Sequence, residues 1–198
     1  MTRVISMVVL LLCTLLAACS GTIQRESAGG HQRLQGLTYR SVDVVMTDNA
    51  KTLLNDNPQF SSQSGFSPLE LEDNLRQRVK AANLLKSNSQ YRVEVTVESF
   101  KVRDTLAAAA FQFLAGTDFI DGYVRVYDDR GMQLHAYKVS ATYSGGGVTG
   151  SLDAMRLSIL YDKFGELAAA ELAGKTEAGS VMPGDSISAS PPAAAAKP

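Results

Sequence analysis

Residues 120–143 read IDGYVRVYDDRGMQLHAYKVSATY, and this stretch decides the fold. Over residues 120–127, Ile, Gly and Val alternate with polar or aromatic residues, which is the pattern of a half-buried strand. Residues 128–131 form a turn signal in which Gly131 can adopt a positive φ. Residues 132–143 return as a second strand. The sequence therefore predicts an antiparallel β-hairpin.

A helix and a strand are predicted before this hairpin. The Ser-Pro-Leu-Glu sequence at residues 67–70 supplies an N-cap, a proline suited to the first helical position and a capping box. Apolar residues then recur every three or four positions, which predicts an amphipathic helix to about Lys86. Strict alternation over residues 91–97 predicts a strand, and a slip in parity predicts a bulge near residues 98–99.

The remaining elements complete the predicted fold. Residues 37–45 are rich in β-formers and predict a strand, whereas the polar stretch 49–65 predicts an irregular connection. Ser151 can cap a last helix whose apolar stripe continues to Leu167. The resulting order, β-α-β-β-β-α, indicates an α/β (α+β) fold in which a small twisted mixed sheet carries two helices on one face.

The amino terminus has the pattern of an export signal. Arg3 precedes an apolar run over residues 4–16, which is shorter than the roughly 20 residues of a membrane-spanning helix. The following Leu-Ala-Ala-Cys, ending at Cys19, resembles the lipobox of bacterial lipoproteins. That resemblance implies lipidation of Cys19 after removal of residues 1–18. The alternative is an ordinary signal peptide cut before an unmodified Cys19.

The lipobox interpretation limits both where the protein is located in the cell and which reactions its side chains could catalyse. Ser20 resembles the residue that follows the lipidated cysteine in lipoproteins sorted to the outer membrane. A lipidated Cys19 would leave the mature chain without a thiol and would exclude cysteine nucleophiles and thiol redox chemistry. The formal net charge of −1 gives no electrostatic attraction to nucleic acid.

Composition divides the chain into four parts. Residues 1–18 are the predicted lipoprotein signal peptide, and residues 19–36 a lipidated flexible tether that is polar and rich in glycine. Residues 37–173 form a single α/β domain. Residues 174–198, with their Gly-Ser, Pro-Pro and poly-Ala sequences, are predicted to be a disordered tail.

Glycines and histidines give little support for catalysis. The pattern Gly145-x-Gly147-x-x-Gly150 is shaped like a dinucleotide-binding loop, but the sheet does not continue after the helix that follows. His31 lies in the predicted tether and His135 on a strand, where a lone histidine is usually a surface or edge residue. We therefore expect neither a catalytic triad, nor a metal site, nor a cofactor.

Four aspartates lie close in sequence, but they are expected at opposite ends of one strand. Asp118 precedes the first hairpin strand, Asp121 points to its polar face, and Asp128 and Asp129 occupy the turn. Residues at opposite ends of a strand cannot form one carboxylate pair. The interpretation as turn and strand-end residues is preferred, and the chain is expected not to be an enzyme.

The segment 106–115 is almost purely apolar, and it leaves two interpretations open. It is either a core helix or continued strand, or an exposed element that packs on a protein partner or the membrane surface. In the second interpretation Leu106, Phe111, Phe113 and Leu114 are the candidate interface residues, and Phe111→Asp should weaken association without unfolding the domain.

Several motifs together resemble a domain of unknown function found in bacterial lipoproteins. Over residues 93–172 they are Arg103, Phe113-Leu114-Ala115-Gly116, Val124-x-Val126-x-Asp128-x-x-Gly131, Gly147-x-x-Gly150 and the Ala-rich final helix. In the order of their elements, such domains are similar to curli-pore, polysaccharide-export and transport-auxiliary lipoproteins.

The resemblance implies a function in binding and assembly. We therefore expect a non-enzymatic lipoprotein at the periplasmic face of the outer membrane, acting as an interaction or assembly module in cell-envelope transport or secretion. Its partners would be the membrane, through the lipid, and a protein or further copies of itself, with no nucleic acid. The alternative is a periplasmic binding module for a small or polymeric ligand.

Overall fold

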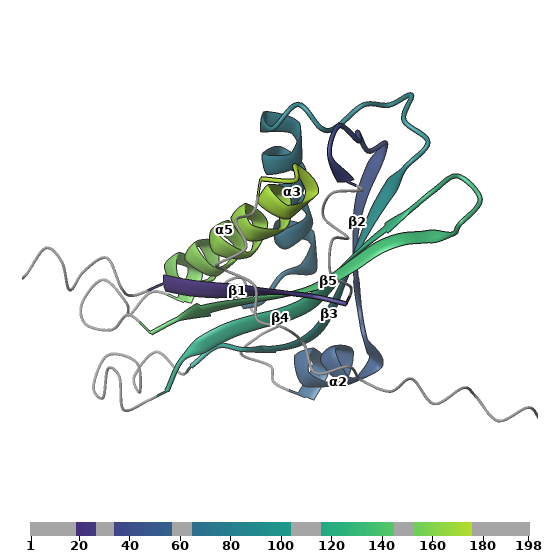
Figure 1. Ribbon diagram of the computed structural model, residues 1–198. Helices are drawn as coiled ribbons and strands as arrows, with labels where there is room; N and C mark the ends of the chain where they lie inside the picture. The colour runs from purple at the N-terminus through teal and green to yellow at the C-terminus, as the bar shows by residue number, and fades with distance from the viewer. Residues whose placement is uncertain (1–18, 27–33, 57–64, 104–115, 145–152, 176–198) are drawn as a thin grey trace, which may run out of the picture.

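A five-stranded mixed sheet forms the centre of the protein. The computed structural model describes residues 19–26, 34–56, 65–103, 116–144 and 153–175. The strands are β1 (Cys19–Arg25), β2 (Ser41–Met46), β3 (Arg92–Lys101), β4 (Asp118–Tyr127) and β5 (Gln133–Tyr143), and the helices are α2 (Asp48–Asp56), α3 (Pro68–Ala81) and α5 (Asp153–Leu172). The strand order is β1-β5-β4-β3-β2 (Figure 1). Only the β2–β3 pair is parallel, so the predicted mixed sheet is confirmed.

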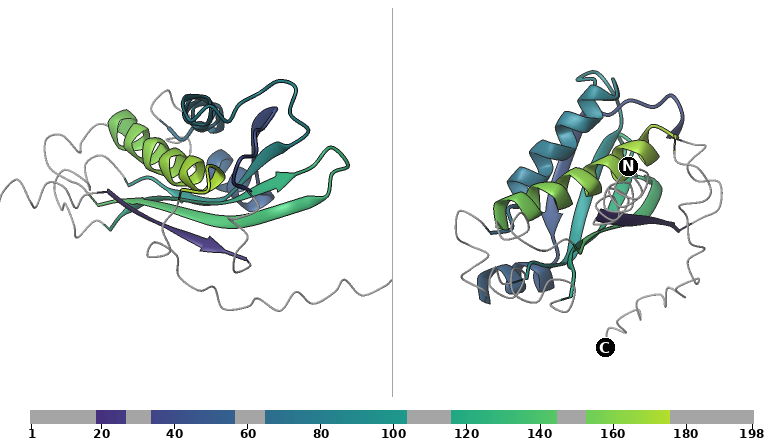
Figure 2. Two further views of the ribbon diagram at one scale, coloured as in Figure 1. Left: turned by 45° about the horizontal axis from the view of Figure 1, so that its top comes forward. Right: turned by 90° about the vertical axis from the view of Figure 1, so that its left-hand side faces the viewer.

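Helices α3 and α5 cover one face of the sheet, as the sequence predicts (Figure 2). Their apolar stripes are buried against the inward residues of the strands, and the buried helix residues include Leu71, Leu75, Val79, Leu160, Phe164 and Leu172. Burying one such side chain stabilises the fold by about 1.5–3 kcal/mol. Among the described residues, no helix has both the length and the apolar character needed to cross a membrane.

The hairpin and the bulge have the predicted positions. Strand β4 pairs antiparallel with β5, and Gly131 in the connecting turn has a φ of 81°. The Asp128 carboxylate accepts hydrogen bonds from the backbone N–H groups of Arg130 and Met132 at 3.0 and 2.8 Å. Between β3 and β4 the register shifts between Val97 and Ser99, which confirms the bulge.

Helix α3 begins as predicted and ends earlier. Ser67 Oγ accepts a hydrogen bond from the Glu70 backbone N–H at 3.3 Å, and a proline follows the cap. The helix stops at Ala81 instead of continuing to about residue 86, because Asn83 adopts a φ of 60°. The N–H of Leu84 then donates to the carbonyl of Val79 at 3.0 Å, which closes the helix end in a Schellman arrangement.

Two predicted loops contain regular structure, and both predictions are corrected. Residues Cys19–Arg25 form the edge strand β1 instead of the start of a flexible tether, because they pair with β5 and bury Ile23 completely. The stretch predicted as an irregular connection contains helix α2, which Thr47 caps by accepting a hydrogen bond from the Ala50 N–H at 3.2 Å. Helix α2 follows directly on β2 and lies at the bottom of the view in Figure 1, apart from α3 and α5, and its Ala50 is buried in the core.

The first predicted strand begins later than expected, at Ser41 instead of residue 37. Tyr39 instead forms an isolated parallel bridge with Leu85, beyond the end of α3. Because the bridge pairs only one residue on each side, strand β2 itself starts two residues further on.

Candidate functional site

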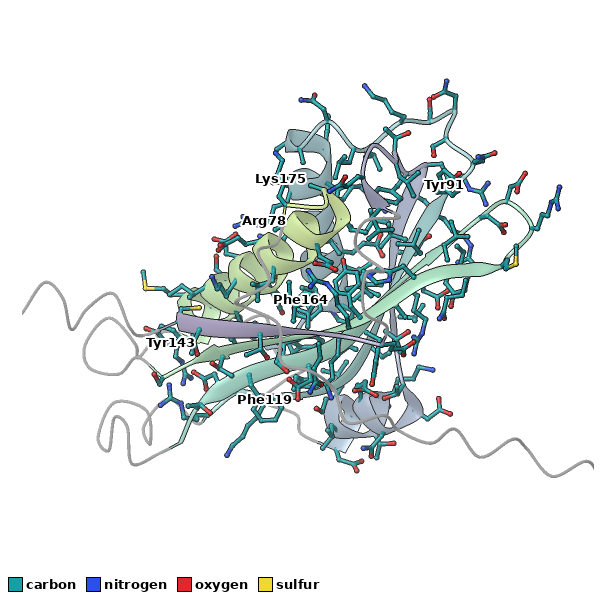
Figure 3. The ribbon with its side chains drawn as sticks, in the orientation of Figure 1. Arg78, Tyr91, Phe119, Tyr143, Phe164 and Lys175 are labelled. Atoms are coloured by element: carbon teal, nitrogen blue, oxygen red, sulfur yellow. The ribbon has the colours of Figure 1, made fainter. Side chains whose placement is uncertain are left out.

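The predicted lipidation residue lies within the sheet. Cys19 is the first residue of β1 and pairs with Tyr143 at the end of β5, which in turn pairs with Asp118 at the start of β4. We call this the Cys19 end of the sheet; Tyr143 marks it in Figure 3. Cys19 has the same strand parity as the buried Ile23, so it faces the helices and packs partly against the core.

The environment of Cys19 does not activate its thiol. Burial raises the pKa of the Cys19 thiol, and the charge of Lys163 only partly opposes this effect. A thiol with a raised pKa is a poor nucleophile at neutral pH, because the thiolate is the reactive form. In the folded protein, this environment therefore does not favour the reactive thiolate form of Cys19.

A buried group of ionic side chains lies beside the same end. This root cluster consists of Arg103, Asp118 and Arg156, which are 4%, 0% and 0% exposed. Arg103 donates through Nε and Nη2 to the two carboxylate oxygens of Asp118, at 3.0 and 2.9 Å. Arg156, from α5, reaches the same carboxylate at 3.3 Å and donates to the Arg103 carbonyl at 2.7 Å. The cluster therefore joins the chain just beyond the end of β3 to β4 and α5.

The root cluster also holds the two residues that flank residues 104–115, the stretch that contains the apolar segment. Arg103 directly precedes residues 104–115, and Gly116 follows them. Arg103 Nη1 donates to the Gly116 carbonyl at 2.9 Å, and the Arg103 N–H donates to Asp118 Oδ1 at 2.7 Å. The candidate interface residues Leu106, Phe111, Phe113 and Leu114 themselves lie outside the described residues. Their attachment points lie together at the Cys19 end.

A second buried group connects the edge strand to the last helix. This edge cluster consists of Arg25 on β1, His135 on β5 and Glu171 on α5. Arg25 Nε and Nη2 donate to the two carboxylate oxygens of Glu171 at 2.5 and 2.6 Å, and this bond raises the pKa of Arg25. His135 Nε2 lies 3.4 Å from Glu171 Oε1. A bidentate, charge-assisted pair of this kind fixes position and orientation together.

Two buried tyrosines extend the contacts of the edge cluster. The hydroxyl of Tyr39 donates to the carbonyl of Leu172 at 3.1 Å, and that of Tyr137 donates to the carbonyl of Ala168 at 2.9 Å. Burial raises the pKa of both hydroxyls, so both remain protonated donors at neutral pH. The last two turns of α5 are thereby fixed to the sheet through polar as well as apolar contacts.

Two polar residues are more buried than the sequence indicated. Asp118 lies at a strand end as expected but is buried in the root cluster, and His135, expected to be a surface or edge residue, is buried in the edge cluster. Strand parity is the signal that sequence reasoning missed. Asp118 is in phase with Ile120 and Val124, and His135 is in phase with Tyr137, so both face the core.

The other candidate residues have separate positions. Asp128 lies in the turn as predicted, and Asp121 accepts a hydrogen bond from Ser140 on the sheet face opposite α3 and α5. His31 and the pattern Gly145-x-Gly147-x-x-Gly150 lie outside the described residues. Within the described ranges, no three His, Cys, Asp or Glu side chains are grouped in a way that would hold a metal ion.

The sheet face opposite α3 and α5 carries alternating aromatic and ionic side chains. The Arg92 guanidinium lies 4.3 Å from the Tyr127 ring centre, and that of Arg125 lies 5.0 Å from the ring centre of Tyr123. Lys138 forms an ion pair of 3.0 Å with Glu98. These side chains bind one another across the strands, which stabilises the sheet and presents a polar surface.

A groove between α3 and α5 lies on the surface of the described residues. It has a volume of about 240 Å³ and is lined by Glu70, Asp73, Asn74, Gln77, Ser158 and Tyr161. Sites that bind small molecules are typically about 300–1,000 Å³ and mostly apolar. This groove is smaller and more polar, so it gives little support to the ligand-binding alternative.

Comparisons with known proteins give structural similarity only. No protein-family model matches the sequence, and no curated protein matches it. Two crystal forms of a PelC dodecamer from Paraburkholderia phytofirmans are 16% and 15% identical, covering 77% of this chain and 98% of that chain with a TM-score of 0.41. A minor lipoprotein from Acinetobacter baumannii is 13% identical, covering 69% of this chain and 92% of that chain with a TM-score of 0.38. Similarity at this level concerns the general arrangement of helices and strands.

Proposed function

We propose that this chain is a lipoprotein of the cell envelope, anchored through Cys19 at the periplasmic face of the outer membrane. The observation that carries the proposal is the Leu-Ala-Ala-Cys motif after a short apolar run. The described residues begin at Cys19, and all the described helices and strands follow the predicted cleavage point. Removal of residues 1–18 would therefore leave the described domain whole.

We further propose that the anchored domain acts by binding and assembly and has no enzymatic activity. The ionisable groups that the fold buries bind one another and connect strands to α5, which is a structural role. The apolar segment 106–115, attached at the Cys19 end, is the candidate contact with a protein partner, a second copy or the membrane. Envelope transport or secretion is the process in which such an assembly module would act.

Lipidation of Cys19 is tested by mass spectrometry of the mature amino-terminal peptide and by cell fractionation. The wild-type chain should yield a peptide that begins at Cys19 and carries acyl chains. Cys19→Ser should abolish lipid attachment and leave the chain unprocessed or soluble. The matched control is Cys13→Ser, which changes the other cysteine, within the predicted signal, and should leave lipidation intact. A processed Cys19→Ser chain in the outer membrane would show that the lipobox interpretation is wrong.

Assembly is tested separately by native mass spectrometry of the lipidated chain in detergent. If the wild-type chain is a homo-oligomer and the Phe111→Asp variant has a lower mass with an unchanged circular dichroism spectrum, self-association through segment 106–115 is supported. A folded variant with unchanged mass would leave only the membrane or a different protein as the contact of this segment. An unfolded variant would show that Phe111 belongs to the core.

A further inference from the structure

The connection between the predicted lipid and the folded domain has almost no length. Cys19 is itself a strand residue, paired with Tyr143, and four residues later Ile23 is fully buried. Arg25 then fixes the strand to α5 through its bidentate pair with Glu171. A lipid on the Cys19 sulfur would therefore be separated from the rigid sheet by only a few covalent bonds.

The Cys19 end contains several chain segments that approach the same boundary. The row formed by Cys19, Tyr143 and Asp118 lies here, and the root cluster brings the start of α5 to it. Met155, in the first turn of α5, is 47% exposed.

The opposite end of the sheet is well separated from this boundary. Strand β4 has ten residues, and a strand rises about 3.3–3.4 Å per residue, so Tyr127 lies roughly 30 Å from Asp118. The hairpin turn beyond Tyr127 carries Met132, which is 58% exposed. In Figure 1 this turn and the start of β1 lie on opposite sides of the molecule.

We propose that the domain lies directly on the bilayer through its Cys19 end, with the hairpin turn directed away from the membrane into the periplasm. The Cys19 end would contact the lipid surface itself. The inference rests on the proposed lipidation and adds to it a preferred orientation, because a short connection to a rigid strand holds the Cys19 end next to the bilayer and limits how far the domain can turn. A domain on a flexible tether would present every side to the membrane.

The test compares two matched methionine positions. If Cys19 is lipidated, the mature chain has no other thiol, so Met155→Cys and Met132→Cys each introduce a single labelling site. Each lipidated variant is labelled with a fluorophore and reconstituted into phosphatidylethanolamine–phosphatidylglycerol vesicles containing a lipid with a nitroxide on its headgroup. The label at residue 155 should be quenched several-fold more strongly than the label at residue 132. Equal quenching at both positions would overturn the proposed orientation.

A linker variant tests whether the short connection causes this orientation. A flexible Gly/Ser insert of about twenty residues between Ser20 and Gly21 has an end-to-end distance of roughly 25 Å. The difference in quenching between the two labels should then largely disappear, while circular dichroism stays unchanged. A difference that persists in full would contradict the proposal, because the orientation would then not depend on the connection at Cys19.

The failure of this inference can be distinguished from the failure of the proposed function. A mature amino-terminal peptide without acyl chains would refute lipidation, and the orientation would be refuted with it. Acyl chains on Cys19 together with equal quenching of the two labels would refute the orientation alone.

Discussion

The root cluster and the edge cluster both bury ionic side chains against the same helix, but they differ in how completely water is excluded. In the root cluster, Asp118 receives hydrogen bonds from two guanidinium groups, and all three side chains are at most 2% exposed. In the edge cluster the Arg25 side chain, on the edge strand, is 8% exposed. A charge at the sheet edge can turn toward water when its partner is lost, whereas a charge in the root cluster cannot. We therefore expect the loss of a charge to lower the free energy of unfolding more in the root cluster than in the edge cluster.

The largest expected effect is that of Asp118→Asn. The amide has nearly the same shape, but it removes the negative charge that Asp118 places between the buried guanidinium groups of Arg103 and Arg156. Breaking a buried ionic group in this way typically costs about 3–5 kcal/mol. Urea unfolding of the mature chain followed by circular dichroism measures the loss.

Asp121→Asn is the matched control for this prediction, because Asp121 lies three residues further along the same strand and on the other sheet face. It bonds to the partly buried Ser140, so its loss should cost about 0.5–1.5 kcal/mol. If the two variants lose the same amount of unfolding free energy, the root cluster contributes no more to stability than the Asp121–Ser140 hydrogen bond.

A smaller effect is expected for Glu171→Gln in the edge cluster. The change replaces the carboxylate that binds Arg25 and His135 by a neutral amide whose oxygen still accepts a hydrogen bond, so the expected loss is about 1.5–3 kcal/mol in total. Hydrogen exchange should show the loss of protection concentrated in β1, since Arg25 is its ionic link to α5. Uniform loss of protection over the whole sheet would show that β1 does not open separately.

The edge strand can also be displaced without changing any charge. A Cβ atom on Gly21 would lie 2.4 Å from Leu167 Cδ1 and 2.8 Å from the Ser140 carbonyl oxygen, so Gly21→Val should push β1 away from α5. Overpacking of this kind costs about 1–3 kcal/mol, measured by thermal or urea unfolding. Thr22→Val, on the exposed side of the same strand, should change stability by less than about 0.5 kcal/mol.

The smallest effect is expected at an exposed ion pair between α3 and α5. Asp162 accepts hydrogen bonds of 2.7 Å from Arg78 and from Asn74, and these bonds lower the pKa of the carboxyl group. Because the Asp162 side chain is 54% exposed, Asp162→Asn should cost only about 0.2–1 kcal/mol at neutral pH.

The pH dependence follows from the direction of the Asp162 pKa shift. A lowered pKa stabilises the fold at pH values above the ordinary value of 3.8, and this contribution is lost as the pH falls through the lowered value. The difference between wild type and Asp162→Asn should therefore shrink below pH 3.8. A difference that grows on acidification would contradict the assignment. At neutral pH, a loss as large as that of Asp118→Asn would remove the contrast between buried and exposed ionic groups.

The elements that the sequence predicted well are those with local, periodic patterns. The hairpin β4–β5, the bulge in β3 and the capped start of α3 each follow from alternation, a parity slip or a capping residue. Such signals are visible within one stretch of chain, because the residues that form the element carry the whole pattern.

The buried ionic residues were partly predictable. Asp118 and His135 follow the apolar parity of their strands, so a strict reading of alternation places both on the core face. Their partners were not predictable, since Arg156 and Glu171 come from a helix more than thirty residues away in sequence. Pairing across that distance depends on how α5 lies on the sheet.

The sequence by itself determined the two amphipathic helices α3 and α5 and the strands with strong alternation, because local periodicity and residue chemistry are sufficient for each. Only the tertiary structure decided that Cys19–Arg25 is a strand. This stretch is mostly polar, and only Ile23 is fully buried; it becomes regular because β5 offers an unpaired edge and Glu171 offers a partner for Arg25. Both partners lie more than a hundred residues away along the chain, so no local pattern in residues 19–25 could announce them.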